Sequence, residues 1–441
     1  MGKLFYSNLL LFIVLTSNSL QATPAIIPMP NKIQAKEGSF LYPKGFDLKI
    51  IRGDDVTKQI FKLLTDSVKN RKINVVPFSN TAISLNLLAT SKNDTPTDAY
   101  TLSINPNNIN INANSNAGLF YGVQSLLQLL RADSTKNLSC MEISDSPVFA
   151  YRGMHLDVAH QFFDISIIKK YIDVMSALKL NQFIWQIAEN TNWRIALKSH
   201  PSFTNKTSNY TTEQVKEIIK YAQDRFINVI PAIRFSTPIT DTTYNNKALA
   251  DEICNLFPST FIQISSNNPT DSLSYFLKQK NKKIIAIDKK TNNKDILLSY
   301  KNSKTGWSDA KKGETVIMAP RQYCSLDYYQ DWDDEKQAFE MTLLPLNVAY
   351  SFRPEGKIKD TATIKHIIGA QAFLYTTYIK NEAALNYQAF PRLLALAECF
   401  WTANQNKNFK DFEVRLKTLK NYFYKEIDLP KIDMVRIKPK Q

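Results

Sequence analysis

The segment MHLDVAHQFFDISIIKKYIDVMSALKLNQFIWQIA (154–188) contains a short apolar run, a stretch with helical periodicity and a second apolar run. Short apolar runs suit buried strands, whereas apolar residues at spacings of three and four are typical of an amphipathic helix. A strand, a crossover helix and another strand in this order predict a parallel sheet. The segment therefore indicates an α/β fold.

The same alternation continues along most of the chain. Apolar runs that suit strands recur at 154–159, 182–188, 227–233, 261–266, 283–288, 295–300, 315–320 and 367–375. The helical pattern at 211–225 opens with a Thr that can cap a helix. Eight strands with intervening helices predict a (β/α)₈ TIM barrel. Only six residues separate the fifth and sixth runs, so we expect an irregular barrel.

A smaller unit precedes the barrel. Residues 24–148 mix strand-like and helical pieces with turns rich in Asn, Pro and Thr, which predicts a small α/β accessory domain. We expect its strands at 46–51, 82–86, 99–104 and 109–111, and its helices at 55–70 and 118–131. A barrel takes about 250 residues. The length of 441 residues suits both units, with 149–441 assigned to the barrel.

The first 22 residues have the pattern of a signal peptide. Lys3 gives a positive start, the segment from Leu9 to Leu15 is apolar, and small residues precede Thr23. The alternative is a retained N-terminal anchor. No later stretch is long and apolar enough for a transmembrane segment. We therefore expect a periplasmic or secreted protein.

The cysteines and the net charge limit the cofactors and partners that the sequence predicts. The four cysteines lack metal-binding spacing, so we expect no metal and no cofactor. The spacing does not show whether disulfides or free thiols are formed by Cys140, Cys254, Cys324 and Cys399. The net charge of +15 comes from dispersed lysines that suit a solvated surface, and no nucleic-acid motif accompanies it. If the charge has a partner, an acidic polysaccharide or an anionic membrane surface suits an exported protein.

One strand candidate is followed by an unusual pair of residues. In FPSTFIQISSNN (257–268), the fourth apolar run ends at Asn267 and Asn268. The carboxyl-terminal ends of barrel strands carry the chemistry in TIM-barrel enzymes. An Asn side chain forms hydrogen bonds but does not ionise or transfer a proton. If this is the edge of an active site, its acid is missing.

Strings in both units share a likeness to one family. They are AIIPMPNKI (25–33), AYTLSI (99–104), AGLFYGVQSLLQLL (117–130), YRGMHLDVA (151–159), LNQFIWQIAENTNWRI (180–195), YAQDRFINVIPAI (221–233), SLDYYQ (325–330), IIGAQAFLYTTYI (367–379) and FPRLLALAECFW (390–401). Together and in this order they resemble glycoside hydrolase family 20, the β-N-acetylhexosaminidases. The resemblance implies an accessory α/β domain before a TIM barrel.

The resemblance also implies a reaction in which the sugar's own acetamido group attacks the anomeric carbon. In the family an Asp orients that group and the adjacent Glu protonates the leaving oxygen. Their positions match Asn267 and Asn268, and a family His nearby matches Gln263. Loss of the general acid alone costs about 10²–10⁴ in rate. The resemblance therefore predicts that the family's reaction has been lost.

The resemblance suggests residues for a remaining sugar site. It matches Arg152 to a sugar-binding Arg and Asp327 to a family Asp, and it places Tyr300 and Tyr375 where family Trp residues stand. Each of these residues also has a structural alternative. Arg152 could pair with a local carboxylate such as Asp157, and Asp327 could accept a hydrogen bond from an amide of its loop. The two tyrosines could cap the barrel core. Family side chains that hold the sugar are replaced at Ser325, Thr377, Ile287, Gln186, Asn190 and Ala232.

Two further residues stand where the family has other side chains. Arg234 replaces an acidic residue, so it either reads a carboxylate or sulfate on a ligand or forms a salt bridge with Glu189. Glu189 and Asp157 lie at or near strand ends, so both are candidates for a migrated acid. His155 and His160 lack evident acid–base partners in the sequence, so we interpret both as structural.

Two hypotheses on function follow. In the first, the protein is an exported, hexosaminidase-like barrel without hydrolase activity that binds a glycan or a partner. In the second, it is an active glycosidase that cleaves terminal N-acetylhexosamine or a related, acidic sugar by a modified mechanism. They differ in whether a carboxylate at the barrel mouth reaches a bound sugar.

Overall fold

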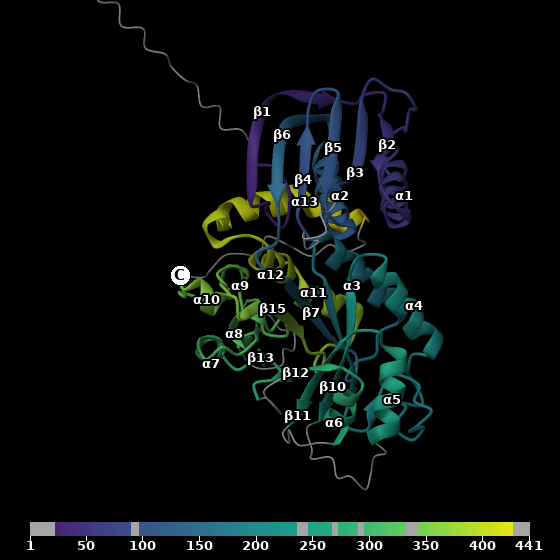
Figure 1. Ribbon diagram of the computed structural model, residues 1–441, viewed down its shortest axis with the longest axis vertical. Coiled ribbons are helices and arrows are strands. Elements are labelled where there is room, and N and C mark those ends of the chain that lie inside the picture. The colour runs from purple at the N-terminus through teal and green to yellow at the C-terminus, as the bar shows by residue number, and fades with distance from the viewer. Residues whose placement is uncertain are drawn as a thin grey trace, which may run out of the picture.

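The computed structural model of the protein describes residues 23–89, 97–235, 246–266, 272–289, 295–331 and 342–426. The predicted signal segment, together with Asn267 and Asn268, lies outside these residues. Within them the chain forms a sheet-and-helix accessory domain and a larger barrel (Figure 1). No helix in these ranges is both long and apolar enough to span a membrane.

The accessory domain is a six-stranded sheet with two helices packed against it. The strand order is β1-β6-β4-β5-β3-β2, so β1 and β2 are the edge strands. The elements are β1 (Lys32–Leu41), β2 (Asp47–Arg52), α1 (Asp55–Lys69), β3 (Ala82–Leu87), β4 (Tyr100–Ile104), β5 (Asn108–Ala113), α2 (Asn116–Ala132) and β6 (Asn137–Asp145). The four strands and two helices expected from the sequence are confirmed. The polar, largely exposed strand β1 and its partner β6 are additional.

All eight predicted barrel strands are present. They are β7 (Tyr151–Asp157), β8 (Gln182–Glu189), β10 (Asn228–Phe235), β11 (Phe261–Ser266), β12 (Lys283–Ile287), β13 (Ile296–Ser299), β14 (Val316–Met318) and β15 (Ile367–Leu374), with a short β9 (Asn192–Trp193) beside β8. Neighbouring barrel strands are parallel, and the pairing of β10 with β8 closes the ring. Strands β12 and β13 pair directly in parallel, as the sequence predicts, and residues 290–294 of the short connection between them lie outside the described residues.

Most of the helices after β7 cover the outside of the barrel, and the last one, α13, lies at the junction with the accessory domain. They are α3 (Ile165–Ala177), α4 (Thr212–Gln223), α5 (Asn246–Leu256), α6 (Ser272–Gln279), α7 (Ser303–Lys311), α8 (Arg321–Cys324), α9 (Leu346–Tyr350), α10 (Thr361–Ile364), α11 (Glu382–Ala389), α12 (Arg392–Trp401), the 3₁₀ turn η1 (Asn404–Asn406) and α13 (Phe409–Glu426). The predicted cap is confirmed, because the side chain of Thr211 accepts a hydrogen bond from the backbone of Gln214 at the start of α4.

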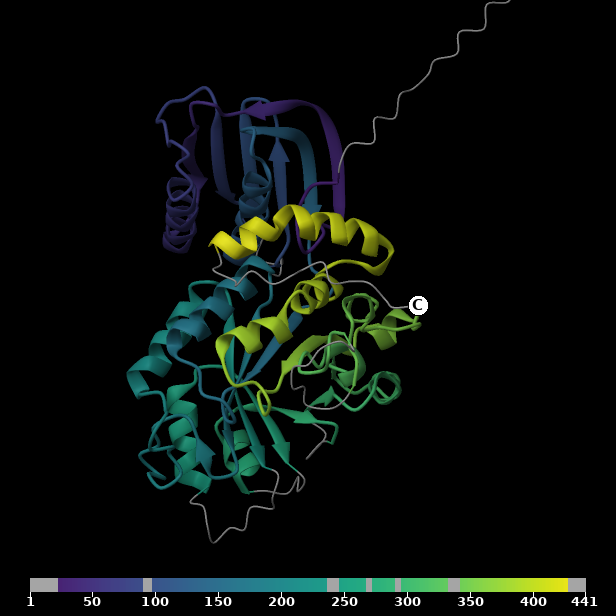
Figure 2. The same cartoon turned by 180° about the vertical axis from the view of Figure 1, so that it is seen from behind.

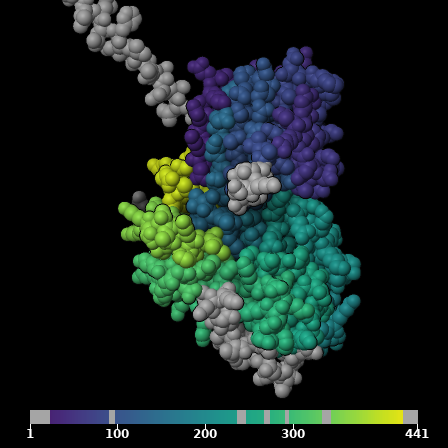
Figure 3. Space-filling view, viewed as in Figure 1, coloured from purple at the N-terminus to yellow at the C-terminus, as the bar shows by residue number. Residues whose placement is uncertain are grey.

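The accessory domain packs on the amino-terminal end of the barrel strands. Strand β6 leads directly into β7, and α13 lies across the junction of the two domains in both views (Figures 1 and 2). Trp401, at the end of barrel helix α12, is fully buried in the accessory core. The space-filling view shows the two domains in broad contact (Figure 3). The carboxyl-terminal ends of the strands, which form the barrel mouth, therefore face away from the accessory domain.

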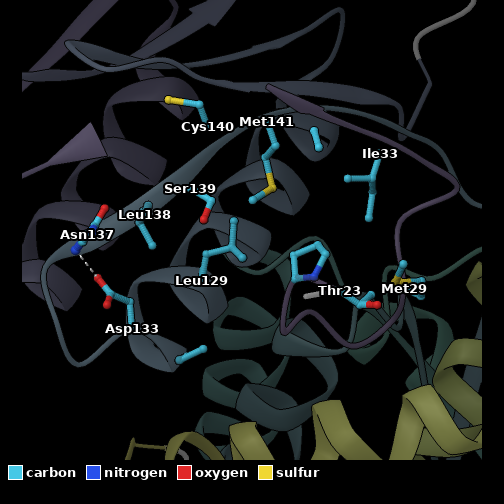
Figure 4. Close-up of a pocket in the computed structure, with 13 residues that line it drawn as sticks. Thr23, Met29, Ile33, Leu129, Asp133, Asn137, Leu138, Ser139, Cys140 and Met141 are labelled. Carbon is cyan, nitrogen blue, oxygen red and sulfur yellow. Dashed lines mark hydrogen bonds between the residues drawn. The ribbon is translucent and has the colours of Figure 1, made fainter. Parts of the chain in front are cut away.

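A cavity of about 470 Å³ lies in the accessory domain, far from the barrel mouth. Its wall is largely apolar, with Leu129, Leu138 and Met141 among the lining side chains (Figure 4). Cys140 is also one of the lining residues, and all four cysteines of the chain are free. The structure therefore selects free thiols from the two alternatives left by the sequence.

Candidate functional site

Four charged side chains meet at the barrel mouth and form what we call the mouth cluster: Asp157, His160, Glu189 and Arg234. Asp157 ends β7, Glu189 ends β8, and Arg234 lies near the end of β10. The Nδ1 atom of His160 lies 2.6 Å from Asp157 and its Nε2 atom lies 2.9 Å from Glu189. Glu189 also lies 3.7 Å from the Nε atom of Arg234, so the predicted salt bridge between these two residues is present.

The mouth cluster holds His160 in its charged form. Hydrogen bonds to Asp157 and Glu189 raise the pKa of His160 to about 10. Burial alone would raise the pKa of Asp157, but its hydrogen bond with His160 and the charge of that ring lower it below the ordinary value. The cluster thus combines two carboxylates with two cations, and its net charge is close to zero. The interpretation of His160 as a residue without acid–base partners is wrong.

His155 differs from His160 because it is completely buried. Burial lowers the pKa of His155 to about 4, so the ring is neutral. Its Nε2 atom lies 3.0 Å from the amide oxygen of Gln186, whose amide nitrogen in turn donates to Asp157. The ring packs against Phe373 and Tyr375. The structural interpretation of His155 is therefore consistent with its surroundings.

Aromatic side chains line the inner wall beside the mouth cluster. Tyr375 is stacked on Phe373 with ring centroids 5.5 Å apart, and Tyr300 meets both rings edge-on. The guanidinium of Arg234 lies over the Tyr375 ring, 5.6 Å from its centroid. Tyr375 is buried and Tyr300 is partly buried, and the Tyr300 hydroxyl lies 3.1 Å from Ser325. Both rings pack with the inner cluster of the barrel, which fits the interpretation of the two tyrosines as caps of the barrel core.

Asp327 lies behind this aromatic wall. Asp327 is buried. Burial of the two tyrosine hydroxyls is the main cause that raises the pKa values of Tyr300 and Tyr375, and the negative charge of Asp327 raises them further. Its loop is held by the buried Arg392, which donates to the backbone oxygens of Leu326 and Tyr328. Arg392 belongs to the string FPRLLALAECFW, so the sequence contained it but gave no sign of its partners.

Arg152 lies at the wrong end of the barrel for the role that the resemblance suggested. It is near the start of β7 and has no exposed surface. Its guanidinium donates to the backbone oxygens of Lys179 and Phe149 and to the carboxylate of Asp98, at 2.8, 2.8 and 2.9 Å. The expected sugar contact is therefore corrected to a structural role, and its carboxylate partner is Asp98 rather than Asp157.

Under the mouth, the barrel interior contains a buried polar chain. The hydroxyl of Tyr151 donates to Gln371, whose amide donates to Gln263 at 3.0 Å. Gln263 lies on β11, the strand that leads to Asn267 and Asn268. These hydrogen bonds satisfy the amides that barrel closure buries. In the described part of the chain, no group of three or more His, Cys, Asp or Glu side chains is placed to hold a metal ion.

Comparison with known families gives two matches that cover most of the chain. The model of the glycosyl hydrolase family 20 catalytic domain matches residues 149–250 and 270–404. The model of domain 2 of the same family matches residues 23–146. The gap in the first match, 251–269, contains β11 together with Asn267 and Asn268. The family pattern is thus interrupted where the resemblance places the catalytic pair.

Individual relatives agree with these matches. A β-hexosaminidase of Porphyromonas gingivalis is 29% identical over 89% of this chain, which spans 62% of that protein. The structure of a β-N-acetylhexosaminidase from Streptomyces coelicolor A3(2) aligns with a TM-score of 0.81 at 19% identity, covering 95% of this chain and 99% of that one. A Streptomyces plicatus β-hexosaminidase with one Asp changed to Asn, in complex with the product N-acetylglucosamine, aligns with a TM-score of 0.80 at 21% identity, covering 95% and 98%.

Proposed function

Because the chain belongs to glycosyl hydrolase family 20, we propose that it is an exported family member that binds a glycan at the barrel mouth without hydrolysing it. The observation that carries the loss of activity is the pairing within the mouth cluster. Glu189, one of the two candidates for a migrated acid, lies between His160 and Arg234, and the other, Asp157, is hydrogen-bonded to His160, which lowers its pKa despite burial. A carboxylate between two cations is stabilised in its charged form, which has no proton to donate.

His160 does not replace the missing acid either. Its imidazolium has two N–H groups, and both are directed at carboxylates, Asp157 on one side and Glu189 on the other. No N–H is left for a glycosidic oxygen. At the family's own acid position the sequence has Asn268, which transfers no proton.

Binding is supported by different features of the same mouth. The side chain of Arg234 remains one-third exposed, and beside it lies the Tyr375 ring. A guanidinium next to an aromatic edge suits a sugar hydroxyl or an acidic group. The Streptomyces plicatus relative with Asp changed to Asn is seen with N-acetylglucosamine. An amide in place of that carboxylate is thus compatible with sugar binding in that protein.

Turnover of chromogenic N-acetylglucosaminides and N-acetylgalactosaminides tests the loss of hydrolysis. We expect no release of chromophore above the buffer blank. Turnover well above the blank that Glu189→Gln abolishes would contradict the proposal and support the alternative, a glycosidase with a modified mechanism. Turnover that Glu189→Gln leaves unchanged would point to a contaminating glycosidase. Purifying the Asn268→Ala variant separately and repeating the assay shows whether the activity belongs to a contaminant.

Calorimetric titration with N-acetylhexosamine-containing and acidic oligosaccharides tests binding. We expect Arg234→Ala to weaken a bound glycan by about tenfold, the effect of losing one polar anchor. Arg225→Ala is the matched control, because this partly exposed Arg lies just after α4 on the outside of the barrel and pairs with Asp173 of α3. A wild-type chain that binds no member of the series would contradict glycan binding and favour a protein partner.

A further inference from the structure

The end of the accessory domain remote from the barrel carries an exposed apolar loop. Strand β6 runs toward the barrel, β4 is antiparallel to β6, and β5 is antiparallel to β4. Strand β3 is parallel to β5, so the loop between α1 and β3 lies at the end farthest from the barrel (Figure 1). We call this the remote end. It is opposite to the barrel mouth.

Three consecutive apolar residues form the tip of this loop. Val76, Pro77 and Phe78 are all exposed, and the exposed fraction of Phe78 is 94%. The backbone N–H of Ser79 donates to the oxygen of Val76, which closes a turn with Pro77 and Phe78 at its centre. Isolated exposed apolar side chains are common, but three in succession at a loop tip are not what solubility favours.

The backbone of Phe78 has an unusual conformation. Its φ angle is 58°, in the left-handed region, and the third position of such a Pro-containing turn normally holds Gly or Asn. A bulky residue there stores strain, and strained residues are retained where the surrounding structure holds them. The backbone N–H of Phe78 donates to Asp47, which is itself buried at the start of β2. The loop therefore holds the Phe78 ring outward.

Positive charge surrounds the tip. Four exposed lysines lie at the same end, in the loops and helix terminus that border it: Lys44, Lys69, Lys72 and Lys136. The nearby carboxylates are engaged, because Asp47 pairs with Lys49 and Asp133 accepts from Tyr42 and Thr135. Leu41, at the end of β1, adds another exposed apolar side chain. The remote end is thus an apolar tip within a basic surface.

We propose that the remote end binds the surface of an anionic lipid bilayer. An aromatic ring with neighbouring apolar side chains inserts among the headgroups, and lysines around it are attracted to anionic lipids. A second copy of the chain suits this surface less well, because it would bring two sets of lysines together. Charge complementarity therefore favours the bilayer.

This contact sets the orientation of the whole molecule. The accessory domain and the barrel are joined by buried contacts, so we expect them to move as one body on the bilayer. With the remote end on the bilayer, the barrel mouth points into the surrounding solution (Figure 1). A protein oriented in this way presents its mouth to large glycans rather than to lipid headgroups.

Sedimentation with vesicles tests the proposal. The chain from Thr23 onward, which contains all three buried hydrophobic clusters of the described residues, is mixed with phosphatidylcholine vesicles with or without phosphatidylglycerol. We expect binding that requires phosphatidylglycerol. Phe78→Asn should weaken this binding by roughly tenfold, because the variant lacks the apolar ring that moves from water into the bilayer. Asn accepts the left-handed conformation, so this variant folds at least as well as the wild type. Lys44→Glu/Lys72→Glu should weaken binding by a similar factor.

Matched variants on the barrel serve as controls. Tyr275→Ala removes an exposed aromatic ring, and Lys357→Glu/Lys359→Glu reverses two exposed charges there. Both should bind vesicles like the wild type. Equal binding to vesicles without phosphatidylglycerol, or equal loss in the control variants, would overturn the proposal. Self-association that Phe78→Asn abolishes, without vesicle binding, would assign the surface to a second copy instead.

Discussion

The two ends of the barrel hold charged side chains in different surroundings. At the amino-terminal end, Lys179 and Asp145 form an ion pair of 3.2 Å in which neither side chain is exposed. At the mouth, the side chains of His160 and Arg234 remain 28% and 33% exposed. A lone buried charge is very costly, so a buried pair must stay complete, whereas a partly exposed cation can exchange its partner for a ligand. The domain junction is thus held by closed, buried ion pairs, whereas the ligand contact that we propose for the mouth relies on cations that solvent reaches.

The largest effect is expected at the domain junction, in the buried pair of Arg415 and Glu398. The two side chains make two contacts of 2.8 Å, and Glu398 also accepts from Tyr350. Arg415→Met leaves the carboxylate buried without its cation and should lower the free energy of unfolding by about 3–5 kcal/mol. Urea unfolding measures the change. Arg415→Met/Glu398→Leu should recover part of it, and a single variant within about 1 kcal/mol of the wild type would contradict the assignment.

Arg152 provides the next test, because its two interpretations predict opposite results. As a buried anchor of the junction it donates to Lys179, Phe149 and Asp98. Arg152→Met should lower the free energy of unfolding by about 2–4 kcal/mol, since several buried acceptors lose their donor. The affinity of folded molecules for any mouth ligand should not change. Weaker glycan binding without loss of stability would restore the sugar-contact interpretation.

A smaller effect, dependent on pH, is expected at the mouth. The folded-state pKa of His160 is raised from 6.5 to about 10, so the stability it contributes is complete below pH 6.5 and is lost as the pH rises toward about 10. His160→Gln should cost about 1–2 kcal/mol at neutral pH, and the difference from the wild type should shrink with rising pH. Urea unfolding across this range measures it. A difference that does not vary with pH would show that the ring is not held as a cation.

The smallest effect is expected for an exposed pair on the accessory domain. Lys62 and Asp66 are 2.9 Å apart on α1, but their side chains are 79% and 54% exposed. Lys62→Met should change the free energy of unfolding by less than about 0.5 kcal/mol, because solvent and salt screen such a pair. Thermal unfolding at low and high salt checks this. A loss comparable to that of Arg415→Met would remove the distinction between buried and exposed pairs.

Sequence reasoning located the barrel strands well, because each is a short apolar run buried on both faces. It missed β1, whose residues KIQAKEGSFL are mostly exposed and therefore lack a clear apolar pattern. It also left His160 without partners. Asp157 is near His160 in sequence, but Glu189 lies on the next strand and meets the ring only after the strands pair.

The sequence by itself determined the positions of the barrel strands, the family resemblance and the absence of an ionisable group at Asn267 and Asn268, because these follow from residue type and local periodicity. Only the tertiary structure decided at which end of the barrel each charged side chain lies and which partner it has. Arg152 and Glu189 were both matched to the mouth, yet barrel closure and the docked accessory domain bury Arg152 at the opposite end. The physical reason is that such contacts join residues far apart in the chain, and burial then selects the partner that neutralises each charge.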